Sequence, residues 1–127
     1  MIYDASSIYR AIEVGEHDKL LEGKTLDLAM YELGNVVWKE VTRDKISSND
    51  GIKLIRFIAK VISLMESLEI GIKSEVLKIA VESNLSYYDA SYLYASISMK
   101  DMLVTEDKKL LDRALERGAS VCRFGNF

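Results

Sequence analysis

The chain has 127 residues, 49% of them hydrophobic, which is enough for one domain with a buried core and too few for two ordinary domains, so we expect a single domain over 1–127. A net charge of −3 excludes a nucleic-acid binder that depends on a broad basic surface alone. The single cysteine excludes an internal disulfide and favours a reducing cytoplasm, and five charged residues interrupt the most apolar stretch, residues 51–72, which excludes an ordinary membrane span.

Short apolar runs alternate with helical patterns through the first half of the chain. Periodicity and break signals predict strands at 1–4 and 24–30, and helices at 5–14, 31–44 and, after a break at Asn49 to Gly51, up to about Leu68. The last of these helices has an apolar arc wider than a helix on one face of a sheet needs. We therefore expect part of it to be covered by a second copy or by a partner helix, with Phe57 or Leu64 among the contacts.

The second half continues the alternation. Helices are predicted at 73–83, 87–99 and 106–118, and strands at 102–105 and 120–124. Strands that alternate with helices are typical of parallel strands joined by crossovers, so the predicted fold class is α/β, with three α/β/α layers around a central, mostly parallel sheet. No glycine-rich phosphate-binding motif is present, which argues against a nucleotide cofactor.

Four acidic residues share an unusual position, because each follows a strand or opens a helix and heads a row of apolar residues at fourfold spacing. They are Asp4, Glu32, Asp89 and Asp107. Functional groups gather beyond the carboxyl ends of parallel strands, so we expect these carboxylates to cluster there. Clustered carboxylates repel one another unless they are protonated or bind a hard divalent cation such as Mg²⁺ or Mn²⁺. Such a cation can hold a water and shield a breaking phosphodiester, which predicts metal-assisted phosphodiester hydrolysis.

Helix capping explains the same residues one at a time. Ser86 followed by Asp89 matches a capping box, and a carboxylate at Glu32 or Asp107 is favourable at a helix N-terminus. Thr105 either caps a helix that starts at Glu106 or lies near a metal-bound water. The spacing alone leaves capping and clustering open.

The stretches that carry these acids resemble motifs of the PIN-domain nucleases, and they occur in the order of that family. They are "IYDASSIYR", "YELGNV", "SYYDASYLYA" and "LVTEDKKL". The resemblance covers essentially the whole chain and is greatest to the VapC-type toxins of toxin–antitoxin pairs. It implies a Mg²⁺- or Mn²⁺-dependent endoribonuclease with RNA as substrate, a protein antitoxin and a homodimeric state. It further implies that Asp4, Glu32, Asp89 and Asp107 are catalytic and bind the metal, with Thr105 in support.

Three other functions remain open at this point. The same fold serves in RNA processing, and a PIN-like domain can act as a scaffold without cutting. A phosphoacceptor receiver domain has similar length and layering, but it needs adjacent acids after the first strand, whereas Asp4 is followed by Ala5 and Ser6. Near the acids, Tyr87 and Tyr88 are interpreted as packing residues in preference to base-stacking ones.

Overall fold

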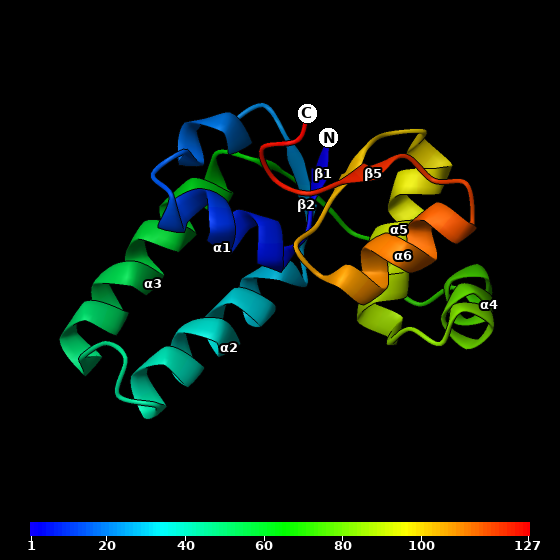
Figure 1. The fold of residues 1–127 in the computed structure, drawn as a ribbon. Helices are drawn as coiled ribbons and strands as arrows, with labels where there is room; N and C mark the ends of the chain where they lie inside the picture. The colour runs from blue at the N-terminus through cyan, green and yellow to red at the C-terminus, as the bar shows by residue number, and fades with distance from the viewer.

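Five strands form one parallel sheet at the centre of the chain, in a computed structural model that describes residues 1–127 (Figure 1). The strands are β1 (Ile2–Tyr3), β2 (Lys24–Leu26), β3 (Glu66–Leu68), β4 (Leu103–Val104) and β5 (Val121–Cys122). Their order is β3-β2-β1-β4-β5, and every neighbouring pair is parallel. This order differs from the flavodoxin-like order of receiver domains, which removes that alternative.

Six α-helices cover the two faces of the sheet. They are α1 (Ala5–Glu13), α2 (Ala29–Thr42), α3 (Ser48–Ser63), α4 (Ser74–Ser83), α5 (Tyr87–Met99) and α6 (Lys108–Glu116), with a short 3₁₀-helix, η1 (His17–Leu20), after α1. Figure 1 shows α1, α2 and α3 on one side of the strands and α4, α5 and α6 on the other. Right-handed crossovers require this division, because the chain moves outward from β1 to β3 and then returns to start again at β4. The predicted three-layer α/β/α fold is confirmed.

The two central strands are buried on both faces. Ile2 lies opposite Leu103 and Tyr3 lies opposite Val104 in the β1–β4 ladder, and none of the four is exposed. They belong to a single cluster of 26 buried hydrophobic residues that joins both helical layers. The centre of the sheet is therefore rigidly packed, and residues that directly follow β1 and β4 have well-fixed positions.

The predicted bounds of the helix up to Leu68 are wrong at both ends. It begins at Ser48, where the Ser47 hydroxyl accepts the Asp50 N–H at 3.1 Å, and it ends at Ser63. Glu66–Leu68 forms the edge strand β3, whose exposed Glu66 and Ser67 give no apolar alternation that would distinguish a strand from a polar helical turn.

Gly51 lies inside α3 and does not mark a break. A Cβ atom at this position would lie 2.6 Å from Cγ2 of Val41, so the glycine allows α2 and α3 to approach closely. None of the helices combines the length and apolar character that a bilayer crossing requires.

Candidate active site

The central pair of strands marks the point where the order of the sheet reverses. The chain leaves β1 toward β2 on one side, whereas it leaves β4 toward β5 on the other. Open parallel sheets bind ligands in the crevice at such a point, beyond the carboxyl ends of the strands. Asp4 directly follows β1 and Thr105 directly follows β4, so both lie at this crevice.

A cleft of about 710 Å³ opens at this position and brings the four predicted acids together. Its polar and aromatic lining consists of Asp4, Glu32, Asp89 and Asp107 together with Ser6, Tyr31, Asn35, Lys39 and Tyr88. Thr105 is fully buried behind Asp4 and does not line the cleft. The four acids come from four different segments, which follow β1, open α2, open α5 and follow β4.

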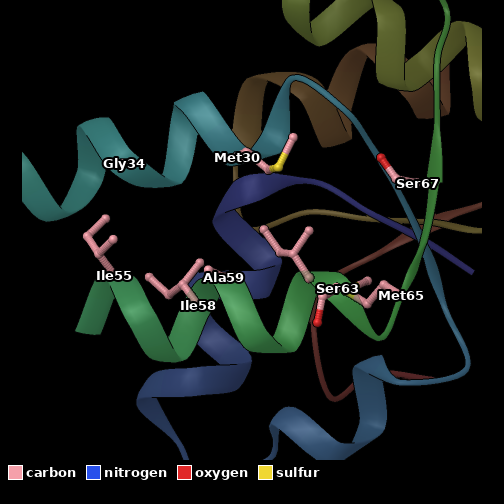
Figure 2. Close-up of a pocket in the computed structure, with 9 residues that line it drawn as sticks. Met30, Gly34, Ile55, Ile58, Ala59, Ser63, Met65 and Ser67 are labelled. Carbon is pink, nitrogen blue, oxygen red and sulfur yellow. The ribbon is translucent and has the colours of Figure 1, made fainter. Parts of the chain in front are cut away.

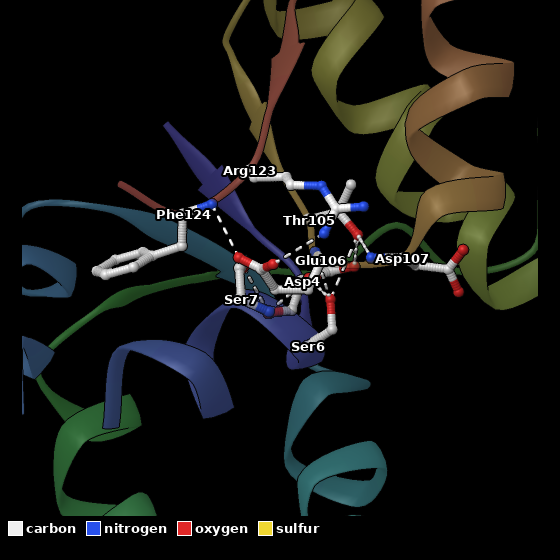
Figure 3. A network of polar contacts seen from close by, with 8 residues as sticks. All are labelled: Asp4, Ser6, Ser7, Thr105, Glu106, Asp107, Arg123 and Phe124. Atoms are coloured by element: carbon white, nitrogen blue, oxygen red, sulfur yellow. Dashed lines mark hydrogen bonds and ion pairs between the residues drawn. The ribbon is translucent and has the colours of Figure 1, made fainter. Parts of the chain in front are cut away.

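Asp4 is almost completely buried and is held at both of its oxygens (Figure 3). Its Oδ1 accepts the Ser7 N–H at 2.9 Å, which caps α1, and the Ser6 hydroxyl at 2.7 Å. Its Oδ2 accepts the Thr105 hydroxyl. Burial raises the pKa of Asp4 above its ordinary value, and these hydrogen bonds oppose that rise. Capping and membership of the cluster are therefore combined in one side chain.

The hydroxyls that bind Asp4 also hold the loop after β4. Ser6 Oγ accepts the Glu106 N–H at 2.9 Å, and Thr105 Oγ1 accepts the Asp107 N–H at 3.0 Å. The Glu106 carboxylate in turn accepts the Phe124 N–H at 3.0 Å, as the network in Figure 3 shows. The segments after β1 and β4 are thus joined by side-chain hydrogen bonds across the crevice.

Glu32 lies in the first turn of α2, partly buried, and receives a hydrogen bond from Tyr92. The Tyr92 hydroxyl, on the buried face of α5, donates to Glu32 Oε1 at 2.8 Å. Burial, with the nearby charges of Asp4 and Asp89, raises the pKa of Glu32 to about 7, although the Tyr92 hydrogen bond opposes the shift. Glu32 therefore exchanges a proton near neutral pH.

Asp89 lies in the first turn of α5, and it is not the residue that caps this helix. Ser86 is the N-cap, and its hydroxyl accepts the Asp89 N–H at 3.1 Å. Burial raises the pKa of Asp89 to about 6, with the charges of Asp107 and Asp4 adding to the shift. In the apolar row that Asp89 heads, Leu93 is buried and Ile97 is exposed, so only the turn next to Asp89 packs into the core.

Asp107 is exposed and caps α6, with Oδ1 accepting the Leu110 N–H at 3.0 Å. The helix therefore begins at Lys108, and the prediction that Thr105 caps a helix starting at Glu106 was wrong. The Thr105 hydroxyl donates to Asp4 and accepts the Asp107 N–H, and Asp107 takes the capping position.

The four acids are not neutralised by ion pairs, although the charge of Lys109 opposes the pKa rise of Asp89. None of them takes part in an ion pair with lysine or arginine. No three acidic, histidine or cysteine side chains lie close enough together to form a metal-binding group as they stand. The raised pKa values of Glu32 and Asp89 are the consequence of this uncompensated charge and of burial.

Several residues of the site were missed by sequence reasoning. Ser6 and Tyr92 contact Asp4 and Glu32, but neither has a sequence pattern that distinguishes it from a helical packing residue. The two tyrosines before Asp89 have different environments. Tyr87 Oη donates to the Gly71 carbonyl at 2.8 Å, whereas Tyr88 is 61% exposed and lines the cleft, so the packing interpretation is wrong for Tyr88.

The chain is similar in sequence to known nucleases and in structure to a crystallised protein, although no family model matches it. The chain is 37% identical over 114 residues to Exonuclease VapC9 of Pyrobaculum aerophilum, covering 87% of this chain and 82% of the relative. It is 27% identical over 93 residues to Ribonuclease VapC3 of the same organism, covering 70% of this chain and 69% of the relative. The crystal structure of PAE2754 from P. aerophilum superposes with a TM-score of 0.80 at 34% identity, covering 94% of this chain and 88% of that one.

Proposed function

The chain belongs to the VapC family of PIN-domain nucleases, and from this premise we propose that its acidic cleft hydrolyses phosphodiester bonds of RNA with the help of Mg²⁺ or Mn²⁺. The observation that carries the proposal is the convergence of Asp4, Glu32, Asp89 and Asp107 on one cleft where the order of the strands reverses. Asp4 and Asp107 each cap a helix, but gathering four carboxylates in one cleft is unfavourable for the fold, because each added carboxylate repels the others.

The residues present fit a hard divalent cation. The donors are all carboxylate oxygens, and their charge lacks a partner within the chain. Mg²⁺ usually keeps several waters and binds one or two carboxylates directly. As the side chains stand, no three of the carboxylates lie close enough together to form a metal-binding group, so the ion would be held directly by one or two of them and by the others through waters. Asp4, Glu32, Asp89 and Asp107 would hold the ion, which when bound supplies positive charge against the phosphate and activates water.

Within the chain, each side chain has a distinct task in this proposal. Asp4 is fixed by Ser6, Ser7 and Thr105, so it provides an oriented carboxylate that cannot rotate away. Glu32 and Asp89 have raised pKa values of about 7 and about 6 in the metal-free protein, so they are the carboxylates whose charged forms a bound cation would stabilise most. Tyr92 positions the Glu32 carboxylate.

The decisive experiment compares cleavage by the wild type and by Asp89→Asn. The substitution keeps the shape of the side chain and removes its charge, so we expect metal-dependent cleavage to be lost while the circular dichroism spectrum is retained. Asp112→Asn, at an acid whose carboxylate accepts only the Lys108 ion pair, is the matched control and should cleave normally. Equal cleavage by Asp89→Asn and the wild type would leave a non-cutting scaffold as the better interpretation.

The mode of cleavage needs its own test, because one relative is named an exonuclease and the other a ribonuclease. We propose endonucleolytic cleavage. A circular single-stranded RNA has no ends, so only an endonuclease converts it to a linear product. A circular RNA that stays intact while its linear form is degraded would assign exonuclease activity instead.

A homodimer and a protein antitoxin are further parts of the proposal, and an apolar groove between α2 and α3 supports them. Figure 2 shows Ile55, Ile58 and Ala59 of α3 directed toward α2, where Met30 and Gly34 lie. This cavity of about 360 Å³ is followed along the helices by a second of about 400 Å³, lined by Trp38, which is 59% exposed. Trp38 therefore lies on a surface and not in the core.

Sedimentation tests whether the exposed side of α3 contacts a second copy of the chain or an antitoxin. Leu64 is exposed directly after α3, so Leu64→Glu should convert a dimer to a monomer without loss of helix content. A wild type that is monomeric at micromolar concentration, and that purifies from its host without a partner, would contradict both the homodimer and the antitoxin. The cytoplasmic location and the single domain over 1–127 stay predictions, as does a toxin role in preference to RNA processing.

A further inference from the structure

One face of α2 presents three side chains of different chemistry to the acidic cleft. Tyr31, Asn35 and Lys39 are spaced four residues apart, so they form a ridge along the helix at intervals of about 6 Å. All three line the same cleft as the four acids. Tyr88, at the start of α5, lines it from a second helix.

The rings of Tyr31 and Tyr88 are largely exposed, and neither makes a hydrogen bond that would stabilise the fold. Tyr31 is 80% exposed and Tyr88 is 61% exposed, and neither hydroxyl is hydrogen-bonded within the protein. Tyr87 shows the contrasting case, because its hydroxyl donates to the Gly71 carbonyl and accepts the Lys73 N–H at 2.9 Å. Large exposed aromatic surfaces beside a cleft are available to a ligand with flat apolar faces.

The position of the rings relative to the acids specifies the ligand. Tyr31 directly precedes Glu32 and Tyr88 directly precedes Asp89, so each ring is carried on the same helical turn as a carboxylate of the cluster. If a phosphodiester is cut at the carboxylates, the neighbouring bases lie within reach of these rings. Nucleobases stack on tyrosine with little dependence on sequence, provided that they are unpaired.

Lys39 and Asn35 complete the ridge. Lys39 is the only cation among the residues that line the cleft, and it takes part in no ion pair, so it is available to a phosphate of the backbone. Asn35 has an amide that donates and accepts hydrogen bonds, as the edge of an unpaired base requires.

We propose that Tyr31, Asn35 and Lys39, with Tyr88, form a track that binds and positions the unpaired nucleotides next to the cleaved bond. This inference rests on the proposed nuclease function and assigns its substrate-binding residues. Tyr31 on α2 and Tyr88 on α5 stack on bases of the RNA, next to Glu32 and Asp89. Lys39 holds a phosphate farther along α2. Paired bases cannot use the track, because their faces are occupied by neighbouring bases in the duplex.

Binding is measured separately from cleavage, by fluorescence anisotropy in EDTA with a labelled 12-nucleotide RNA pool of mixed sequence. We expect Tyr31→Ala to weaken binding on the order of tenfold, because the loss of one stacking contact has about that effect. Tyr31→Phe keeps the ring and should bind within about twofold of the wild type. Val81→Ala shortens an exposed side chain of α4, a helix that contributes no residue to the cleft, and it should not change binding.

Salt dependence provides a second readout that a merely structural role would not change. Lys39→Ala should reduce the slope of log K against log salt by about 0.7, the value for one phosphate contact on a single strand. Lys60→Ala, at an exposed position of α3, should leave the slope unchanged. The same RNA pool annealed to its complement should bind the wild type and Tyr31→Ala equally weakly.

The outcomes separate the track from the nuclease function. Equal binding by Tyr31→Ala and the wild type, equal weakening by Val81→Ala, or no binding of single-stranded RNA in EDTA overturns the track. If the wild type still opens the circular RNA in those cases, the nuclease function stands without the track. If the wild type cuts no RNA while Tyr31 and Lys39 still govern binding, the nuclease function fails and the track remains only a binding surface.

Discussion

Replacing Thr105 with valine tests how strongly the site depends on a group that never reaches the cleft. The substitution removes one hydroxyl and keeps the branched shape of a fully buried side chain. Asp4 Oδ2 loses the hydrogen bond from Thr105, and a hydrogen bond to a charged group contributes about 1.5–3 kcal/mol. The Asp107 N–H also loses its acceptor, but water can replace it because Asp107 is exposed.

We therefore expect Thr105→Val to lower the free energy of unfolding by about 2 kcal/mol and the melting temperature by about 5–10 °C. The loss should be followed by thermal and urea unfolding, and cleavage should be assayed well below the new melting temperature. Cleavage should fall as well, because without this hydrogen bond burial raises the pKa of Asp4 further and favours its protonated form. Thr105→Ser keeps the hydroxyl and should retain most of the activity.

Ser96→Ala is the matched control for this prediction. The Ser96 hydroxyl is also buried, but it donates to the backbone carbonyl of Asp101 at 2.6 Å, which is uncharged. This contact lies at the end of the sheet away from the cleft. Its removal should lower the free energy of unfolding by about 1 kcal/mol and leave cleavage unchanged. If Thr105→Val is no less stable than Ser96→Ala and cleaves like the wild type, then Thr105 does not support a charged Asp4.

Three more predictions concern the acids themselves. Millimolar Mg²⁺ or Mn²⁺ should raise the melting temperature of the wild type and raise that of Asp4→Asn much less, whereas an equal rise would indicate a general salt effect. In EDTA the melting temperature should fall between about pH 4 and pH 7 and then level off. The folded protein binds more protons than the unfolded chain in this range, because the pKa values of Glu32 and Asp89 are raised to about 7 and about 6. Glu32→Gln should flatten this profile, and a flat profile in the wild type would contradict the pKa values. Asp107→Asn should abolish cleavage and change the free energy of unfolding by less than about 0.5 kcal/mol, because asparagine caps a helix about as well as aspartate; normal cleavage would leave Asp107 as a cap alone.

Local sequence signals were sufficient for most of the fold. The helix over 87–99 was predicted with the bounds that α5 has, and its start was marked in the sequence by the capping residue Ser86. In the structure it ends at Lys100 in a left-handed conformation, for which the sequence offered no signal. The strand β3 was not predicted, since its three residues lie at the edge of the sheet and two of them are exposed. Only its pairing with β2 makes it a strand, and pairing is a long-range property.

In the site too, local sequence signals identified some residues, whereas long-range contacts were not predicted. The four acids were identified because each has a local signal, namely a carboxylate where a strand ends or a helix starts. Tyr92 was not identified, because it lies 60 positions from Glu32. Thr105 was predicted in a supporting role, but its hydrogen bond to Asp4, 101 positions away, was not. Those contacts depend on the strand order, which brings β1 and β4 together at the centre of the sheet.

Capping and clustering turn out to be parts of one arrangement and not alternatives. Four helices, α1, α2, α5 and α6, begin at this crevice, and each has one of the acids as its N-cap or in its first turn. The positive ends of four helix dipoles point at the carboxylates, and backbone N–H groups fix two of them, so the fold itself offsets part of their repulsion. The offset is incomplete, because the pKa values of Glu32 and Asp89 remain raised. The negative charge that the helices leave uncompensated is what a divalent cation would neutralise, and this is why the same residues serve both the fold and the proposed chemistry.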